Sequence, residues 1–194
     1  MRLERRFFAR DAAVVAKELL GTRLVHAVDG VRLEGVVVET EAYCGPLDRA
    51  CHARFGRTKA REHLFAGPGT AYVFLVYGMH LCFNVTCLRE GAGHAVLVRA
   101  VETASGKGDG PGRVARVMRL ERGHGGEDLV VSPRLFFERT QRRARVGAIG
   151  VSARVGVAYA GEDARLPLRF FDAESRGVSR PPKGAIGLDE KRND

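Results

Sequence analysis

The sequence contains no tryptophan, few cysteines and no long apolar segment. Four cysteines among 194 residues are too few for a secreted scaffold held together by disulfides. No apolar run approaches the roughly 20 residues that a membrane-spanning helix needs. Charged Asp11, Lys17 and Glu18 interrupt the residues that follow the basic N-terminus, so no signal peptide is recognisable. We therefore expect a cytoplasmic protein with reduced thiols.

Lysine is also scarce, because only five of the 32 basic side chains are lysine and the others are arginine. With 23 acidic residues, the formal net charge is +9. Arginine binds phosphate bidentately and stacks on flat rings, so this composition suits a partner that carries phosphate. The apolar fraction of 45% is too high for a disordered chain and predicts a globular one.

The cysteines do not have the spacing of a metal site. Two pairs are separated by six and by four residues, and neither is a CxxC motif: Cys44 with Cys51, and Cys82 with Cys87. His52 and His80 lie nearby, but structural zinc sites normally use tighter ligand pairs. We therefore predict small buried thiols, no bound metal and no cofactor.

Helical and alternating patterns of apolar residues predict the secondary structure. One helix is expected over residues 11–20, ended by Gly21, and another over 109–123, with Pro111 near its start. Asp29-Gly30 between two β-rich runs predicts a hairpin. One strand is expected before Asp29 and seven after it. The seven are at 31–43, two within 70–86 that are joined at Gly78-Met79, and at 94–102, 129–137, 149–159 and 166–171.

These elements predict an α+β fold. Residues 1–194 are expected to form a single domain built on a curved, mostly antiparallel β-sheet, partly open and barrel-like, with packed helices. Residues 44–69 lack periodicity and predict a long functional loop with a short helix near 61–65. The polar residues 176–194 predict a loose tail.

Two carboxylates share one face of a valine-rich strand. Glu39, Glu41 and Tyr43 alternate along it, so their side chains point the same way. Buried carboxylates need compensation, so they lie either at an exposed strand end or beside a partner. A functional pair would supply a general base or metal ligands, and the like charge of one would raise the pKa of the other.

Aromatic and basic side chains form two further groups. Tyr72 and Phe74 share one face of a strand, where they either pack in a core or form a stacking platform for bases, and Tyr77 stands next to the predicted turn. Arginines recur every third residue on the second predicted helix, where they form either a solvated face or, since acidic partners are scarce, a phosphate-binding surface: Arg113, Arg116, Arg119 and Arg122. Asn84 and Arg99 are polar residues within apolar strands.

Several segments resemble the alkyladenine (3-methyladenine) DNA glycosylase family. They are Val38-Glu-Thr-Glu-Ala-Tyr-Cys-Gly-Pro46, His52, Gly67-Pro-Gly-Thr-Ala-Tyr-Val-Phe-Leu-Val-Tyr-Gly-Met79, Asn84, Leu97-Val-Arg-Ala100, and later Gly110–Gly112, Glu127–Leu129 and Ala153–Val157. The resemblance covers about residues 8 to 171. It implies a monofunctional hydrolase without AP-lyase activity. We expect this hydrolase to be a monomer that needs no obligate protein partner and acts on damaged double-stranded DNA.

The resemblance also implies a role for each matching residue. Glu41 matches the general base, and Arg99 and the backbone around Val155 match groups that hold the attacking water. Base-pocket residues follow: Tyr43 matches one wall, His52 and Phe74 the other with Tyr72 in support, and Asn84 a residue that disfavours guanine. Tyr77, with Met79 nearby, matches the side chain inserted into the duplex where the target nucleotide leaves the stack.

Two departures from the family and two other functions remain open. Phe74 stands where many members have tyrosine, and Lys59-Ala60-Arg61 replaces the usual Pro-Arg-Asn. Independently of the resemblance, we expect Arg113 and Arg116 to contact the DNA backbone. The alternatives to a glycosylase of alkylated or deaminated purines are a metal-dependent nuclease that uses Glu39 and Glu41, and a non-enzymatic nucleic-acid-binding module.

Overall fold

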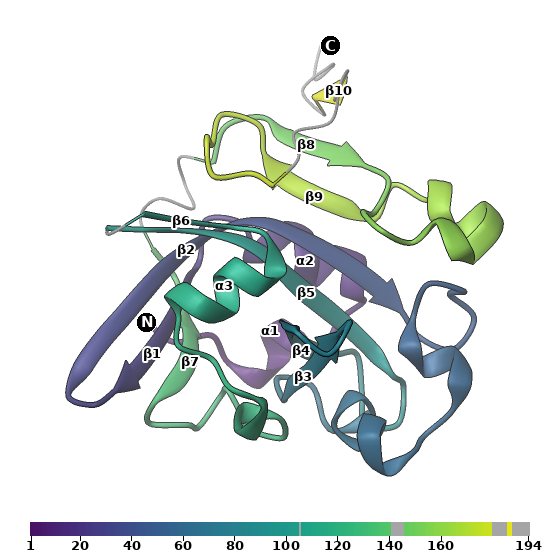
Figure 1. The fold of residues 1–194 in the computed structure, drawn as a ribbon, viewed down its shortest axis with the longest axis horizontal. Coiled ribbons are helices and arrows are strands. Elements are labelled where there is room, and N and C mark those ends of the chain that lie inside the picture. The colour runs from purple at the N-terminus through teal and green to yellow at the C-terminus, as the bar shows by residue number, and fades with distance from the viewer. Residues whose placement is uncertain (105, 141–145, 180–185, 188–194) are drawn as a thin grey trace.

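The computed structural model describes residues 1–104, 106–140, 146–179 and 186–187. Across these residues, ten strands form one antiparallel sheet that curls into half a barrel (Figure 1). Its main path runs β10-β8-β9-β2-β5-β4-β3, while β1 pairs with β2 and β7, and β6 pairs with β5. The strands are β1 (Arg23–Val28), β2 (Val31–Cys44), β3 (Ala71–Val76), β4 (His80–Cys87), β5 (His94–Thr103), β6 (Gly106–Asp109), β7 (Leu135–Glu138), β8 (Ile149–Ser152), β9 (Arg169–Asp172) and β10 (Ile186–Gly187).

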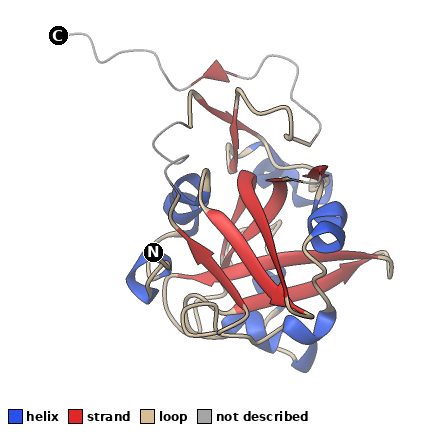
Figure 2. Ribbon diagram, turned by 90° about the vertical axis from the view of Figure 1, so that its left-hand side faces the viewer, coloured by secondary structure: helices blue, strands red, loops and turns tan. Residues whose placement is uncertain are grey.

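Short helices surround the sheet (Figure 2). The α-helices are α1 (Arg5–Phe8), α2 (Ala12–Leu19) and α3 (Pro111–Val117), and the 3-10 helices are η1 (His52–Phe55), η2 (Lys59–Phe65), η3 (Arg122–His124) and η5 (Ala158–Arg165). Figure 1 shows α3 in front of the strands and α2 behind them. None of the helices in the described ranges has the length and apolar character needed to cross a bilayer. The observed architecture is the α+β fold with a curved antiparallel sheet that the sequence predicts.

Helix α2 shows why these residues fold locally as they do. The Asp11 side chain caps the helix by accepting a hydrogen bond from the Ala13 N–H at 2.8 Å. Val15, Ala16 and Leu19 follow at helical spacing and are fully buried against the sheet. The cap and the apolar stripe together fix where the helix begins and which face it turns to β2 and β5.

Strand β2 is the centre of the sheet. The turn before it has both central residues in the left-handed region, Asp29 at φ 51° and Gly30 at φ 72°, as a two-residue hairpin requires. Its first half pairs with β1 and its second half with β9, while β5 runs along the other edge. The second half therefore has neighbours on both sides, which buries the side chains from Val37 to Ala42.

A chain of imidazoles joins β1 to the segment after α3. The His26 Nδ1 lies 2.8 Å from the Met118 carbonyl oxygen, and its Nε2 lies 3.2 Å from the His124 Nε2. The Glu121 N–H donates to the His124 Nδ1 at 2.9 Å. One arrangement satisfies all three contacts with both rings neutral: His26 donates to Met118, and His124 donates to His26. Burial lowers the pKa of His124, which favours this neutral pair.

The structure corrects several predicted boundaries. The predicted helix over 109–123 ends at Val117, because Arg119 adopts φ 49° and the N–H groups of Arg119 and Leu120 turn back to carbonyls of the helix. This is a Schellman ending with arginine in the position that glycine usually takes. The turn between β3 and β4 is centred on Tyr77-Gly78, one residue earlier than the predicted Gly78-Met79.

Other strands are shorter than predicted. The strand predicted over 129–137 begins at Leu135, and the one predicted over 149–159 ends at Ser152, where a loop leads into η5. The segment 44–69 contains two 3-10 helices instead of the single short helix expected near 61–65. Helix α1 and strand β6 have no counterpart in the sequence prediction.

The structure describes residues 176–179 and 186–187 of the predicted loose tail. Ser179 is buried and hydrogen-bonded to Glu39, so the described beginning of this segment packs against the sheet. Ile186 and Gly187 pair with β8. The rest of the tail prediction lies outside the described residues.

Candidate active site

A pair of irregularities in the sheet brings the acidic and basic residues of the site together. Between β2 and β5, Val37 pairs with Val101, Glu39 with Ala100 and Thr40 with Val98. One residue is therefore skipped on each strand, Val38 on β2 and Arg99 on β5. Such bulges re-aim side chains locally. Here they let the Arg99 guanidinium reach both Glu39 and Glu41 on the same face of the sheet.

Glu39 is the buried anchor of a polar network. Its Oε1 accepts hydrogen bonds from the Nε of Arg99 at 2.8 Å and from the Nε of Arg169 at 2.7 Å. Ser179 adds its backbone N–H to the Oε2 at 2.6 Å and its hydroxyl to the Oε1 at 3.0 Å. Arg169 also donates to the Ser179 carbonyl oxygen. A fully buried carboxylate is thus compensated by two cations and a serine, which answers the question that the sequence left open.

Glu41 is equally buried but less fully engaged. Its Oε1 accepts a hydrogen bond from the Val155 N–H at 2.7 Å, and the Arg99 Nη1 lies 3.4 Å from the same oxygen. The Tyr43 hydroxyl donates to the Oε2 at 2.9 Å. Burial raises the pKa of the Glu41 carboxyl, while Arg99, the Val155 N–H and the Tyr43 hydroxyl oppose the rise. The result is an ionisable carboxylate with a raised pKa, surrounded by donors rather than by hydrocarbon.

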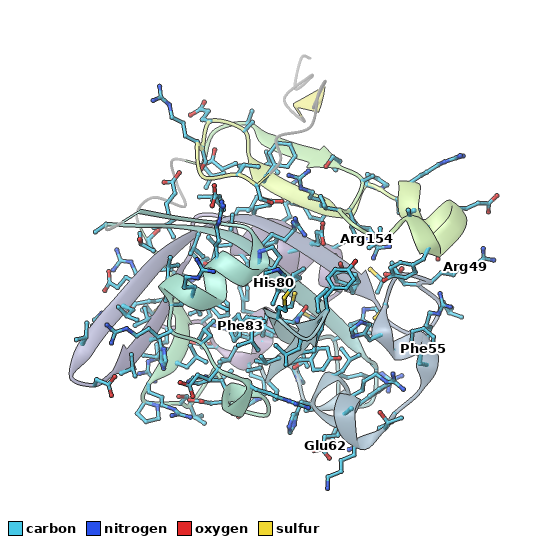
Figure 3. All side chains as sticks on the ribbon, in the orientation of Figure 1. Arg49, Phe55, Glu62, His80, Phe83 and Arg154 are labelled. Carbon is cyan, nitrogen blue, oxygen red and sulfur yellow. The ribbon has the colours of Figure 1, made fainter. Side chains whose placement is uncertain are left out.

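Arg154 holds the loop that presents Val155 to Glu41. Its guanidinium makes a bidentate pair with Asp48, at 2.5 and 2.8 Å, and donates to the Ala42 carbonyl oxygen at 2.9 Å. It also lies 4.9 Å from the centre of the Tyr43 ring. Figure 3 shows Arg154 between η5 and the end of β2. This buried ion pair therefore holds the Val155 N–H in position and places a guanidinium against one face of the Tyr43 ring.

The rings of His52, Tyr72 and Phe74 form an aromatic cluster, against which Tyr43 also packs. The His52 and Phe74 ring centres are 4.5 Å apart, and those of Tyr72 and Phe74 are 5.3 Å apart. The His52 Nδ1 lies 2.9 Å from the Tyr72 hydroxyl, which fixes the imidazole. Burial and the charge of Arg61 lower the pKa of His52, so this cluster is neutral at pH 7. A neutral cluster does not repel a positively charged ring placed against it.

Asn84 lies on β4, directly across from Tyr72. It is buried, and its amide nitrogen donates to the backbone carbonyl oxygens of Tyr72 at 3.0 Å and Cys82 at 3.4 Å. These bonds fix the orientation of the side chain. Asn84 therefore lies on the strand next to the one that carries Tyr72 and Phe74.

The turn between β3 and β4 projects two apolar side chains into solvent. Tyr77 is 87% exposed and Met79 is 73% exposed. Tyr77 adopts φ 52° and Gly78 φ 68°, and the Met79 N–H donates to the Val76 carbonyl oxygen at 3.1 Å. The turn is thus a tight hairpin of the kind that suits the twist of the two strands. A tyrosine at its tip has no partner to pack on within the described part of the chain.

The start of α3 lies close to this hairpin. A side-chain carbon added at Gly112 would approach the His80 Nδ1 to 3.2 Å, which places the helix against the first residue of β4 (Figure 3). Arg113 and Arg116 are exposed on this helix, and Arg113 pairs with Asp109 at 2.6 Å. Arg119 and Arg122 follow the end of the helix, so they do not extend its stripe as the sequence predicted.

The structure also shows residues that sequence reasoning did not select. Arg169, Ser179, Arg154 and Asp48 support the site, and no spacing in the sequence marks them as its neighbours. A surface recess of about 300 Å³ lies elsewhere, beside α1, and is lined by residues that include Arg2, Arg6 and Phe7 rather than Glu41. All four cysteines are free thiols. The sequence-based roles of the site residues remain predictions.

The sequence matches known proteins along most of its length. The family model described as methylpurine-DNA glycosylase (MPG) matches residues 6–176. A protein of Myxococcus xanthus is 46% identical over 184 residues, which cover 92% of this chain and 94% of the relative. A protein of Desulfitobacterium hafniense is 39% identical over 202 residues, covering 92% and 98%. Both carry the name "Putative 3-methyladenine DNA glycosylase". The chain therefore belongs to the methylpurine-DNA glycosylase family.

Proposed function

We propose that the protein is a DNA glycosylase for alkylated or deaminated purines, with 3-methyladenine, 7-methylguanine, hypoxanthine and ethenoadenine as candidate substrates. It flips the damaged nucleotide out of duplex DNA and hydrolyses its N-glycosidic bond with a water molecule activated by Glu41. The arrangement of donors around the buried Glu41 carboxylate supports this proposal most strongly. Family membership supports the class of reaction.

Glu41 suits the role of general base. Among the described residues, its Oε2 accepts a hydrogen bond from Tyr43 alone, which leaves an acceptor position for a water proton. Its Oε1 is held by the Val155 N–H and by Arg99, so the carboxylate cannot turn away. The raised pKa makes the carboxylate a stronger proton acceptor, and the surrounding donors favour its charged form.

The reaction follows from these positions. The water oxygen attacks C1′ of the sugar, its proton passes to Glu41, and the bond between C1′ and the purine nitrogen breaks. A cationic purine such as 7-methylguanine leaves as a neutral base, whereas a neutral purine needs a proton or hydrogen bonds on leaving. The negative charge of Glu41 also favours the positive charge that develops on the sugar. The products are free base and an abasic site, without strand cleavage.

The aromatic walls suit the recognition of the flipped base. Tyr43 on one side and His52 with Phe74 on the other would enclose a purine between flat rings. A cationic base gains about 0.5–2 kcal/mol from each favourable ring face. Because burial keeps His52 neutral, it adds to this attraction instead of opposing it.

The exposed hairpin and α3 suit the contact with DNA. Flipping a nucleotide costs a few kcal/mol, and Tyr77, 87% exposed, would fill the vacated space in the stack with Met79 beside it. Arg113 and Arg116 lie on the neighbouring helix, where they can bind phosphates. We propose that the protein acts as a monomer on damaged duplex DNA in the cytoplasm, where a bacterial chromosome lies.

The contacts of Glu39 argue against a metal-dependent nuclease. Its oxygens accept four hydrogen bonds from Arg99, Arg169 and Ser179, and the two guanidinium charges oppose a cation at the same place. A nuclease would cleave undamaged DNA and lose its activity in EDTA. A non-enzymatic binding module would release no free base from any damaged duplex.

Glu41→Gln tests the proposal. Duplexes with 3-methyladenine, 7-methylguanine, hypoxanthine or ethenoadenine are incubated with each protein, and free base is measured. We expect base release to fall by about 10²- to 10⁴-fold, since a general base contributes about that much. Binding to the same duplexes should change by less than about threefold. Equal rates of base release in the variant and the parent would reject the mechanism.

A further inference from the structure

A cluster of three different ligand types lies where the start of α2 meets the end of β2 and the start of β5. Asp11 caps α2, Cys44 is the last residue of β2, and His94 is the first residue of β5. Cys44 and His94 face each other across the β2–β5 ladder. One carboxylate oxygen, the sulfur and one imidazole nitrogen all lie within 4.8 Å of one another.

The imidazole of His94 has a buried nitrogen, the Nδ1, without a hydrogen-bond partner among the described residues. The Oδ2 of Asp11 lies 3.9 Å away, which is beyond hydrogen-bonding distance. A buried polar atom without a partner is rare in folded proteins and calls for an explanation.

Only one of the two carboxylate oxygens of Asp11 is used in capping α2. Its Oδ1 already caps α2 through the Ala13 N–H, and its Oδ2 is the oxygen nearest His94. The Asp11 side chain is 50% exposed, while that of His94 is 15% exposed. The cluster is thus open to solvent on the Asp11 side and closed on the side of the sheet.

We propose that Asp11, Cys44 and His94 form a binding site for a zinc ion, separate from the catalytic residues. Thiolate, imidazole and carboxylate are the ligand types that zinc prefers, and three protein ligands leave a fourth position for water. That position falls on the exposed side of Asp11. On binding, the Cys44 thiol releases its proton to solvent and the sulfur bonds to the ion, with no change of oxidation state.

The geometry needs only a small adjustment. Zinc bonds of about 2.0–2.3 Å require the ligand atoms to approach each other by up to roughly 1 Å from their present limit. Asp11 precedes a helix and its carboxylate is half-exposed, so it is the ligand that can move. The sequence prediction of no metal considered His52 and His80, whereas the fold brings His94 to Cys44 instead.

The bound ion would tie α2 to the ends of β2 and β5. Cys44 directly follows Tyr43, the proposed wall of the base pocket, so the ion would hold the strand end that carries this ring. Zinc binding should therefore raise Tm. With free zinc at about 100 times its Kd, the expected rise is about 5 °C or more.

Cobalt(II) provides the direct test, because a cobalt–thiolate bond gives a charge-transfer band in the near ultraviolet. The reduced full-length protein is freed of metal by EDTA and dialysis and then titrated with Co²⁺, followed by displacement with Zn²⁺. We expect saturation at one ion per chain. Cys44→Ser and His94→Gln should each weaken binding by roughly 100-fold or more, and Cys44→Ser should also remove the band.

Two further variants control for loss of folding and for metal binding by a different thiol. Asp11→Asn keeps the helix cap, because asparagine caps helices as well as aspartate, and should weaken zinc binding by about 10- to 100-fold without lowering Tm in the absence of metal. Cys87→Ser removes another buried thiol that is paired with His94 on its other side but lies outside the cluster. It should bind Co²⁺ as the parent does. Absence of saturable binding below about 10 µM, an unchanged band in Cys44→Ser, or a band lost in Cys87→Ser would each overturn the assignment.

Discussion

Replacing Glu39 by glutamine removes one charge from the buried network without removing volume. Glu39 accepts four hydrogen bonds, two of them from arginines. Glutamine offers one acceptor oxygen and places an NH₂ group among donors. The buried guanidinium groups of Arg99 and Arg169 then both lose the negative charge of this carboxylate, while Arg99 keeps Glu41 at 3.4 Å. The substitution therefore tests whether Glu39 holds Arg99 in place.

The expected loss of stability is large for a single isosteric change. Removing one partner of a buried ion pair costs about 3–5 kcal/mol of the free energy of unfolding. For a chain of this length each kcal/mol lowers Tm by roughly 2–4 °C, so the expected fall is about 6–20 °C. Since domains are stable by about 5–15 kcal/mol, the variant should still fold at low temperature.

Glu39→Gln should also change the pH dependence of base release. The negative charge of Glu39 contributes to the raised pKa of Glu41, although burial is the main cause, and Arg99 acts in the opposite direction. Without Glu39, Arg99 is free to move fully onto Glu41. Both effects lower the pKa of the base, so the acidic limb of the pH–rate profile should move to lower pH. A loss of stability alone would not move this limb.

Urea unfolding and single-turnover base release between pH 4.5 and about 8 measure both effects. Glu34→Gln is the matched control, because it makes the same change on β2 at an exposed pair with Arg23 and Arg32. There the expected loss is about 0–1 kcal/mol, with no change in the pH profile. If Glu39→Gln costs less than about 1 kcal/mol and leaves the profile in place, the reasoning about Arg99 is refuted.

Three further predictions concern DNA contact and acid stability. Tyr77→Ala should slow base release from duplex DNA by about 5- to 150-fold, since a stacked base is worth about 1–3 kcal/mol, and should affect single-stranded substrate much less; equal effects on both would contradict insertion. Replacing Arg113 and Arg116 together by alanine should reduce the slope of log Kd against log salt by about 2, and an unchanged slope would exclude phosphate contacts there. Because burial lowers the pKa of His124, the folded state binds fewer protons than the unfolded state in acid, so the free energy of unfolding should be full above about pH 6.5 and fall as pH decreases below it. Urea unfolding at pH 7.5 and 5.5 measures this loss, which should be smaller in His124→Gln.

Local signals predicted the fold well where a residue type determines the backbone. Asp29-Gly30 predicted the hairpin before β2, and Gly21 predicted the end of α2 within two residues. The end of α3 was missed, because Arg119 occupies the left-handed position that glycine normally marks. This ending places the following Leu120 in the hydrophobic core, and such a tertiary contact cannot be read from the local sequence.

In the candidate site, too, local patterns predicted some features, whereas others depend on the tertiary structure. The alternation of Glu39, Glu41 and Tyr43 predicted a shared face, and the structure brings all three together. Neither the paired bulges that aim Arg99 nor the contribution of Ser179 could be read from periodicity. Both depend on register between strands far apart in the chain, which no local pattern encodes.

The long sequence separation within the Glu39 network has a consequence for folding during synthesis. The partners of this carboxylate lie 60, 130 and 140 residues further along the chain. Contacts of such long range form late in folding, because closing long loops is entropically costly. A growing polypeptide that has not yet synthesised Ser179 carries an acidic pair that is only partly neutralised. Base release should consequently appear only after Ser179 has been synthesised, and truncation before Ser179 should reduce the rate of base release more than it reduces the affinity for DNA.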